Sequence, residues 1–281
     1  MITFILMLVA AVPAAYFTYT AGQGGHYVLA PLAFIGAALA VSIPINLWIR
    51  KRLLAVSSRL QERLQEAQEG IRRKVMAMQN KGMGGPKLLA QLEHEQEQAI
   101  RGALPILDEA SPLQKWSLMV GKQVNVMRGQ LLFQVRDYDA ARPLLAKAMA
   151  FDPMIICMQM VLAWRADHDD AKTLDKLYKR GVGRFKYDKA VLIYALYSWL
   201  LVKQNRIDAA VEALDRGKEK TSDPVIAQNW DHLVNNQLKR FSFAGLGEQW
   251  YALGMEAPPQ ARPPRQPQAQ FGGRVNRGGF R

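Results

Sequence analysis

The first 49 residues contain no lysine, arginine, aspartate or glutamate. Two apolar runs lie in this segment, residues 2–20 and residues 27–49, and an uncharged, glycine-rich link of residues 21–26 joins them. Each run is close to the ~20 residues that a helix needs to cross a hydrocarbon layer of ~30 Å. Because so short a link permits only a tight turn, the sequence predicts a hairpin of two transmembrane helices over residues 1–49.

Charged residues set the expected orientation of this hairpin. Arg50, Lys51 and Arg52 follow the second run directly, and the whole net charge of +13 lies beyond residue 49. Since basic residues favour the cytoplasmic side, we expect a multi-pass protein of the cell inner membrane with both termini in the cytoplasm and the lipid bilayer as a partner. An alternative is that the first run is a cleaved signal peptide, because residues 12–15 are small, although no basic residue precedes the run.

The composition of the two runs bears on what the hairpin does. Neither run contains an ionisable side chain, which a transport pathway usually needs. Gly36 and Ala40 stand four residues apart in the second run, a spacing typical of close helix packing. The sequence therefore predicts a packed anchor rather than a transporter.

A basic helical hairpin is predicted over residues 50–111. Apolar residues recur at intervals of three and four, at Leu53, Val56, Leu60, Leu64, Ala67, Ile71, Val75 and Met78. Residues 50–87 hold ten Lys and Arg against three Glu, and a glycine-rich break at 82–86 separates this helix from a second one over 87–104. The basic side chains either contact anionic lipid or form a solvated face that sets the topology. The residues predicted to contact lipid or another anion are Arg50, Lys51, Arg52, Arg59, Arg63, Arg72, Arg73 and Lys74.

Small and apolar residues recur between Pro112 and Asp223 with a period close to 34 residues. The first copy contains Gly129, Ala140, Ala141, Leu145, Ala148, Asp152 and Pro153. The last copy contains Asp208, Ala209, Ala210, Leu214 and Gly217, and a degenerate middle copy contains Asp169, Asp170, Ala171 and Leu174. This pattern resembles the tetratricopeptide repeat, in which small residues let two antiparallel helices approach closely and a proline ends the second helix. The layout of two spans followed by repeats also resembles bacterial HemY-type membrane proteins.

The resemblance implies a function in protein binding, because such arrays present the first helix of each repeat on a concave surface. The partner-binding residues that it implies are Gln123, Val126, Gln130, Phe133, Met160, Trp199 and Lys203. The lysine and asparagine pattern with which some members of the family clamp a carboxyl terminus is absent, since Val126 and Gln130 stand at its first two positions. We therefore expect an amphipathic partner helix rather than a charged peptide end.

Residues that support catalysis or metal binding are sparse. Cys157 lies in an apolar helical run, which is typical of a buried structural cysteine. Residues 167–170, Asp-His-Asp-Asp, form one acidic cluster, but short carboxylates before a helix ordinarily cap its free N–H groups. We find no nucleophile paired with a base and no phosphate loop. The sequence therefore predicts a protein that is not an enzyme and has neither a metal nor a cofactor.

The C-terminal part of the sequence contains two segments of different composition. Residues 225–255 contain many aromatic residues, and we expect further helices that cap the last repeat of a domain covering residues 112–257. Residues 258–281 are rich in Pro, Gly and Arg and hold no acidic residue, which predicts a disordered tail. Every segment before the tail is thus predicted to be helical, so the expected fold class is all-α. The leading hypothesis is a membrane-anchored cytoplasmic scaffold for a protein partner. The alternative is that the basic helix and the tail bind anionic lipid or nucleic acid.

Overall fold

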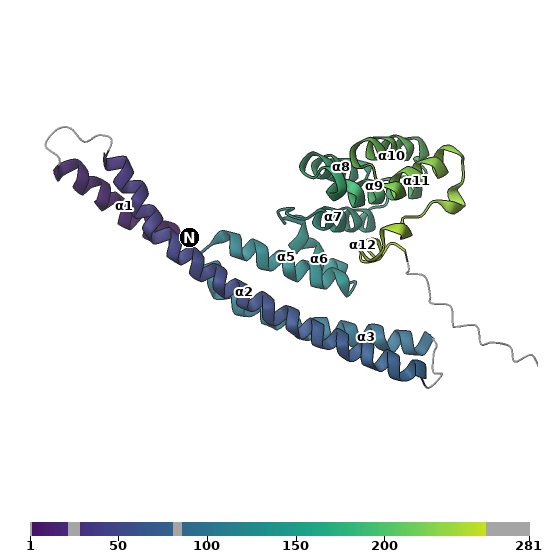
Figure 1. Ribbon diagram of the computed structural model, residues 1–281, viewed down its shortest axis with the longest axis horizontal. Coiled ribbons are helices and arrows are strands. Elements are labelled where there is room, and N and C mark those ends of the chain that lie inside the picture. The colour runs from purple at the N-terminus through teal and green to yellow at the C-terminus, as the bar shows by residue number, and fades with distance from the viewer. Residues whose placement is uncertain (1, 22–28, 81–85, 257–281) are drawn as a thin grey trace, which may run out of the picture.

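The computed structural model of the protein describes residues 2–21, 29–80 and 86–256, so the predicted link at 22–26, the break at 82–85 and the tail at 258–281 lie outside the described residues. The α-helices are α1 (Ile2–Ala21), α2 (Leu29–Asn80), α3 (Pro86–Ala103), α4 (Ser111–Gln114), α5 (Leu118–Gln134), α6 (Tyr138–Ala146), α7 (Pro153–Ala166), α8 (Ala171–Arg184), α9 (Val191–Lys203), α10 (Ile207–Thr221), α11 (Pro224–Val234) and α12 (Glu248–Tyr251). The 3₁₀ helices are η1 (Leu104–Ala110), η2 (Tyr187–Ala190), η3 (Leu238–Arg240) and η4 (Ala244–Leu246). Every regular element in the described ranges is thus a helix, which confirms the all-α prediction. Figure 1 shows a long rod of α1, α2 and α3 beside a compact stack of shorter helices.

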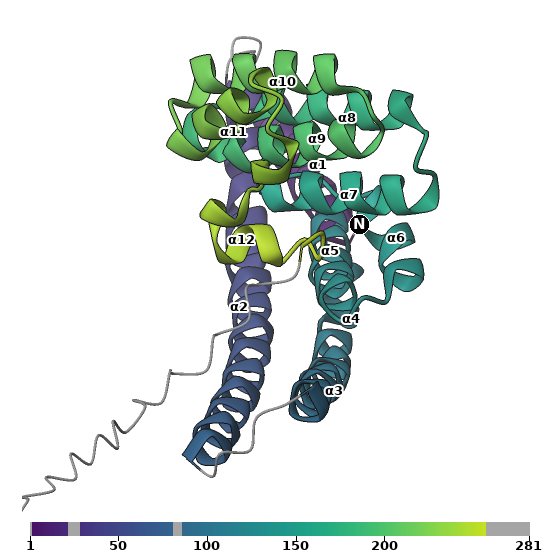
Figure 2. The same ribbon diagram turned by 90° about the vertical axis from the view of Figure 1, so that its right-hand side faces the viewer.

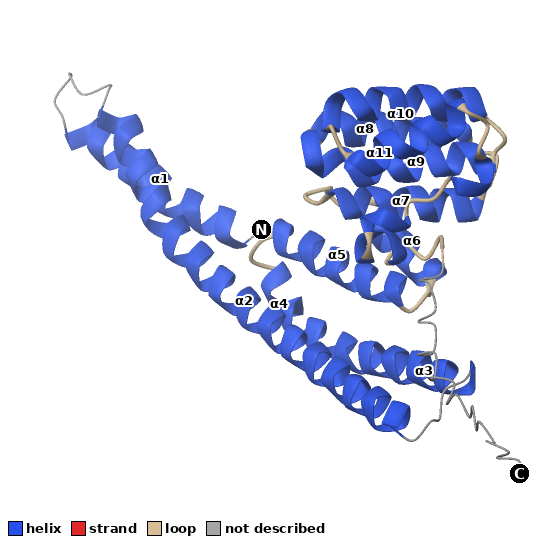
Figure 3. Ribbon diagram, turned by 45° about the vertical axis from the view of Figure 1, so that its right-hand side comes forward, coloured by secondary structure: helices blue, strands red, loops and turns tan. Residues whose placement is uncertain are grey.

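α1 and α2 form the predicted pair of apolar helices, and both are long and apolar enough to cross a membrane. They lie side by side in Figures 1 and 3. Ala11 and Ala38 are buried where the two helices meet, whereas Gly36 and Ala40 are exposed, and a Cβ at Gly36 would find no atom within 4 Å. The predicted packing through Gly36 and Ala40 is therefore wrong, because that face of α2 points away from α1.

α2 continues without interruption from its apolar run into the basic segment. The predicted apolar stripe is confirmed from Leu53 to Val75, because its members are the covered positions of this half of the helix: Val56 and Leu60 are buried, and Leu53, Leu64, Ala67, Ile71 and Val75 are half-buried. The side chain of Met78, its last predicted member, lies outside the described residues. The residues between them on the helix are mostly exposed. Since periodic apolar side chains bury one face of a helix, the stripe marks the side of α2 that packs against α3 and η1.

Two hydrophobic cores share one helix. The first core lies between α2, α3, η1 and α5, with Ile100, Leu107 and Val124 among its buried side chains. The second core fills the helix stack and receives Phe133 from the other end of α5. The predicted domain boundary at residue 112 falls within α4, and α5 belongs to both parts of the fold.

The stack is built from helix pairs packed as repeats, α5 with α6, α7 with α8 and α9 with α10 (Figure 2). The buried residues that recur along the second member of each pair, or directly after it in the case of Ala148, are Ala141, Leu145 and Ala148, then Leu174, Tyr178 and Gly181, then Ala210, Leu214 and Gly217. The three residues of each triplet have the same spacing along the chain. The quasi-repeat in the sequence therefore corresponds to a repeated packing of helix pairs. The middle copy is degenerate because the bulky Leu174 and Tyr178 occupy its first two positions.

Asp-Pro pairs open helices in this stack. Asp152 caps α7 by accepting a hydrogen bond from the Met154 N–H at 2.8 Å, and Pro153 is the first residue of that helix. Asp223 caps α11 in the same way, and Pro224 follows it. The expectation that Pro153 ends the second helix is therefore wrong, since α6 already ends at Ala146 and a proline at the first position needs no N–H partner.

The same turn follows α5, α9 and α11. In each turn one residue has a left-handed backbone, Arg136 (φ 61°), Asn205 (φ 58°) or Asn236 (φ 55°). The next N–H donates to the carbonyl five residues before it, from Asp137 to Leu132 at 2.9 Å in the first turn. This is the helix-ending motif that favours glycine or asparagine at its left-handed position. Because α11 ends in this turn, it has the place of the first helix of a fourth, incomplete repeat.

Of the three left-handed residues in these turns, Arg136 is the least suited to its backbone conformation. A Cβ is costly there, and asparagine tolerates this conformation better than arginine. Arg136→Gly should raise the free energy of unfolding by about 0.5–1 kcal/mol. Lys179→Gly, which removes a comparable exposed side chain from the middle of α8, should lower it by about 1 kcal/mol. Urea unfolding of the two full-length variants in detergent measures both changes, and a loss of stability in Arg136→Gly would contradict the turn assignment.

Candidate partner groove

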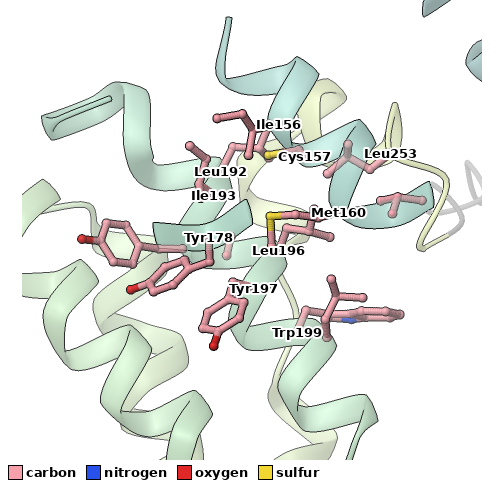
Figure 4. Close-up of a cluster of buried hydrophobic side chains, with 14 of the residues drawn as sticks. Ile156, Cys157, Met160, Tyr178, Leu192, Ile193, Leu196, Tyr197, Trp199 and Leu253 are labelled. Atoms are coloured by element: carbon pink, nitrogen blue, oxygen red, sulfur yellow. The ribbon is translucent and has the colours of Figure 1, made fainter. Parts of the chain in front are cut away.

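Three of the seven predicted partner-binding residues are core residues. Phe133 is 2% exposed, Met160 is 0% exposed and Trp199 is 7% exposed. Phe133 packs edge-on against Tyr138 at 5.2 Å between ring centres. In Figure 4, Met160 and Trp199 lie in one cluster with Leu253. The folded chain itself covers these side chains, so the structure does not present them to a partner.

The chain's own C-terminal segment, residues 241–256, supplies this cover. The expectation of further helices over residues 225–255 is confirmed, but after Val234 these helices are single turns, η3, η4 and α12, and the chain returns toward α5 and α7 (Figure 2). Phe243, Trp250 and Leu253 are fully buried against the repeats. The segment thus lies over first helices of the repeats, where the resemblance placed a partner.

Hydrogen bonds of polar groups hold the C-terminal segment in place. The carboxylate of Glu256 accepts hydrogen bonds from the indole N–H of Trp199 at 2.9 Å and from that of Trp250 at 2.8 Å. The side chain of Asn229 donates to the Ser242 carbonyl and accepts from the Ser242 N–H, each at 2.9 Å. Hydrogen bonds to a charged acceptor are stronger than neutral ones. The segment is therefore an integral part of the stack.

Part of the predicted surface remains open beside α5. Gln123 is exposed and Val126 is half-buried, and both line a hollow of about 320 Å³. The rest of this hollow is formed by Met119, Lys122, Met149 and Phe151. Met119 is 50% exposed, Met149 37% and Phe151 61%. Three large apolar side chains thus face solvent around one concavity.

A second hollow of about 670 Å³ shares Phe151 with the first. It extends past Gln130 and Met154 to Leu192 and to Leu246 of the C-terminal segment. We call the two hollows together the open groove. Gln123, Val126 and Gln130 are the predicted residues that it contains, whereas Lys203 lies outside it with its ammonium over the Trp199 ring at 4.8 Å.

The groove contains residues that sequence reasoning missed. Met149 and Phe151 lie in the connection between α6 and α7, where helical periodicity gives no guidance. The available signal was that two large apolar residues stand in a stretch outside any helix. Comparison of the chain with protein-family models, with curated proteins and with solved structures found no match. The geometry of the groove is therefore the basis for the function proposed below.

Ion pairs within the chain engage half of the residues predicted to contact lipid or another anion. The pairs are Arg59 with Glu109 (2.7 Å), Arg63 with Glu66 (3.4 Å), Arg73 with Glu69 (3.4 Å) and Lys74 with Glu95 (2.8 Å). The hydrogen bond from Lys74 is the main cause of the lowered pKa of the Glu95 carboxyl. Many of the basic side chains along α2 therefore form ion pairs with carboxylates of their own chain.

Among the basic residues next to the apolar run, Arg52 contacts a tryptophan ring rather than a carboxylate. The guanidinium of Arg52 lies over the ring of Trp48 at 5.9 Å, and Trp48 packs edge-on against Trp116 at 5.8 Å. The Thr3 hydroxyl donates to the Trp116 carbonyl at 2.7 Å. The start of α1, the end of the apolar run of α2 and the start of α5 therefore meet at one level, where tryptophan and basic residues are typical of a membrane interface.

The acidic cluster at 167–170 has a structural role. Asp170 caps α8 by accepting from the Thr173 N–H at 3.0 Å, and hydrogen bonding by the side chain and then the backbone of Thr173 lowers the pKa of its carboxyl. The described residues contain no group of His, Cys, Asp or Glu arranged to hold a metal ion. Cys157 is fully buried, and burial raises the pKa of its thiol, which makes it a poor nucleophile.

Proposed function

We propose that this protein is a membrane-anchored scaffold of the tetratricopeptide-like kind, whose open groove holds an amphipathic helix of a protein partner. The observation that carries the proposal is the concave apolar surface formed by Met119, Met149 and Phe151 around Val126. Exposed apolar surface of this kind commonly marks an interaction site. A partner would remove these side chains from water and gain the hydrophobic free energy of their burial.

The composition of the groove supports a helical partner. Methionine side chains are flexible and polarizable, so Met119 and Met149 can adapt to different apolar side chains. Lys122, Gln123 and Gln130 stand beside the apolar side chains. Amphipathic helices bind such grooves with apolar residues spaced three and four apart, while their polar face stays in water.

The proposed setting is the cytoplasmic face of the bacterial inner membrane. Two helices long and apolar enough to span a membrane support an anchor. Arg50, Lys51 and Arg52 directly follow the second apolar run, and the ion pairs found among the described residues do not involve them. They are therefore the basic residues best placed to meet anionic lipid and to keep this end in the cytoplasm.

Site-specific crosslinking tests the groove. A photoreactive residue at Gln123 in the full-length protein should yield one main protein adduct in intact membranes. Met119→Glu should reduce this adduct about tenfold, because a carboxylate must lose its hydration to enter an apolar contact. Met76→Glu is the matched control, since Met76 and Met119 are each 50% exposed but Met76 lies on α2. Equal adduct yields in the two variants would refute the groove as the binding site.

A further inference from the structure

The connections between successive helix pairs lie at one end of the stack. α5 begins beside Trp116, at the level where α1 begins, and runs away from the apolar hairpin (Figure 3). Each second helix returns toward the hairpin before the next pair starts. The connections after α6 and after α8 therefore lie on the hairpin side of the stack, and the shared hollow lined by Phe151, Phe185 and Lys189 joins them.

Exposed basic and aromatic residues gather at this end. Tyr187 is 73% exposed, and it is flanked by Arg184, Lys186 and Lys189, which are exposed too. The guanidinium of Arg184 lies over the ring of Phe151 at 5.6 Å, so the two connections meet through this pair. We call Lys147, Arg184, Lys186, Tyr187 and Lys189 the hairpin-side edge.

The backbone of Tyr187 shows that its exposure is built into the fold. Its φ of 56° is left-handed, which is uncommon for an aromatic residue and is held only where surrounding structure enforces it. Phe185, two residues earlier, is 8% exposed and anchors the connection in the core. The connection therefore buries one aromatic ring and presents the next one to solvent.

The opposite end of the stack differs in charge. Its turns carry six acidic residues, Asp137, Asp139, Asp167, Asp169, Asp170 and Asp208, mixed with the basic Arg136, Arg206, Lys239 and Arg240. At the hairpin side Asp152 and Asp223 are helix caps, and Asp188 stands among the basic residues of the edge. Basic residues beside the exposed rings of Phe151 and Tyr187 thus characterise the end that faces the apolar hairpin, whereas acidic and basic residues are mixed at the opposite end.

We propose that the hairpin-side edge is a second membrane contact, which rests on the surface of an anionic lipid bilayer. Lysine and arginine are attracted to anionic headgroups within a Debye length, and tyrosine favours the headgroup region because its ring is apolar and its hydroxyl polar. The inference rests on the proposed insertion of α1 and α2, which brings this edge toward the bilayer. The contact would fix the direction in which the open groove faces.

Fluorescence quenching in vesicles tests the contact. The full-length protein is reconstituted with phosphatidylcholine, with or without phosphatidylglycerol, and lipid spin-labelled at the headgroup quenches a fluorophore on an introduced cysteine. Gly183→Cys is the reporter, because Gly183 is exposed next to the edge and a Cβ there meets no atom within 4 Å. Asn205→Cys reports on the opposite end. Cys157 is buried, so the fluorophore should not label it. A labelling reaction with the unsubstituted protein checks this.

The expected result is several-fold stronger quenching at Gly183→Cys than at Asn205→Cys in vesicles with phosphatidylglycerol. Adding Lys186→Glu and Lys189→Glu should remove this difference while the melting temperature stays unchanged. Leu39→Cys with chain-labelled lipid reports on insertion of α2 separately. Quenching at Leu39→Cys, with no stronger quenching at Gly183→Cys than at Asn205→Cys, would overturn the edge contact but still support the insertion of α2. The absence of quenching at Leu39→Cys would overturn both proposals.

Discussion

Replacing Gly129 with leucine should lower the free energy of unfolding by about 3 kcal/mol, the upper part of the range for overpacking. A Cβ at this position would lie 2.8 Å from Cγ and 2.9 Å from Cδ2 of Leu145, and 3.3 Å from Cβ of Leu144. Leu145 is fully buried, so its side chain has no room to withdraw. α5 and α6 would have to separate at the point where they cross.

The matched control is Gly183→Leu. Gly183 also lies in a helix, α8, but a Cβ there finds no atom within 4 Å. Since leucine is the better helix former by almost 1 kcal/mol, this variant should be neutral or slightly more stable. Urea unfolding of both variants in detergent, followed by far-UV circular dichroism, compares them directly. Similar unfolding midpoints would show that the crossing at Gly129 is not tight.

The contrast between Gly129 and Trp199 shows what the sequence can predict. Gly129, Ala141 and Leu145 meet across neighbouring helices of one pair, so their spacing carries the packing information. The stripe from Leu53 to Val75 is predictable for the same reason, since one face of a single helix is buried. Patterns of this local kind predicted the buried face of α2, the helix pairs and the two apolar N-terminal helices.

The candidate groove was predictable only in part. Trp199 was predicted to face a partner because the sequence does not show that residues 241–256 return to cover it. That segment has no helical period, and its contacts with Trp199 join residues far apart in the chain. Met149 and Phe151 were missed for a related reason, because they form a surface only when the connection after α6 lies beside Val126.

Replacing Trp250 with alanine should have the largest effect, a loss of about 3–5 kcal/mol in the free energy of unfolding. Trp250 is fully buried, with its ring centre 5.2 Å from that of Phe243 and 6.2 Å from that of Trp199. Truncation would leave a cavity and would also remove the indole N–H that donates to Glu256 at 2.8 Å. Urea unfolding followed by circular dichroism measures the change without depending on tryptophan fluorescence.

Trp48→Ala is the matched control for this substitution. Trp48 is 44% exposed in a helix, so its truncation removes the same side chain and creates a much smaller cavity. We expect it to change the unfolding of the stack by less than about 1 kcal/mol. If Trp250→Ala proved as mild as the control and also exposed Trp199 to an aqueous fluorescence quencher, residues 241–256 would be a displaceable cover. In that case the first helices of the repeats, rather than the open groove, would be the surface offered to a partner.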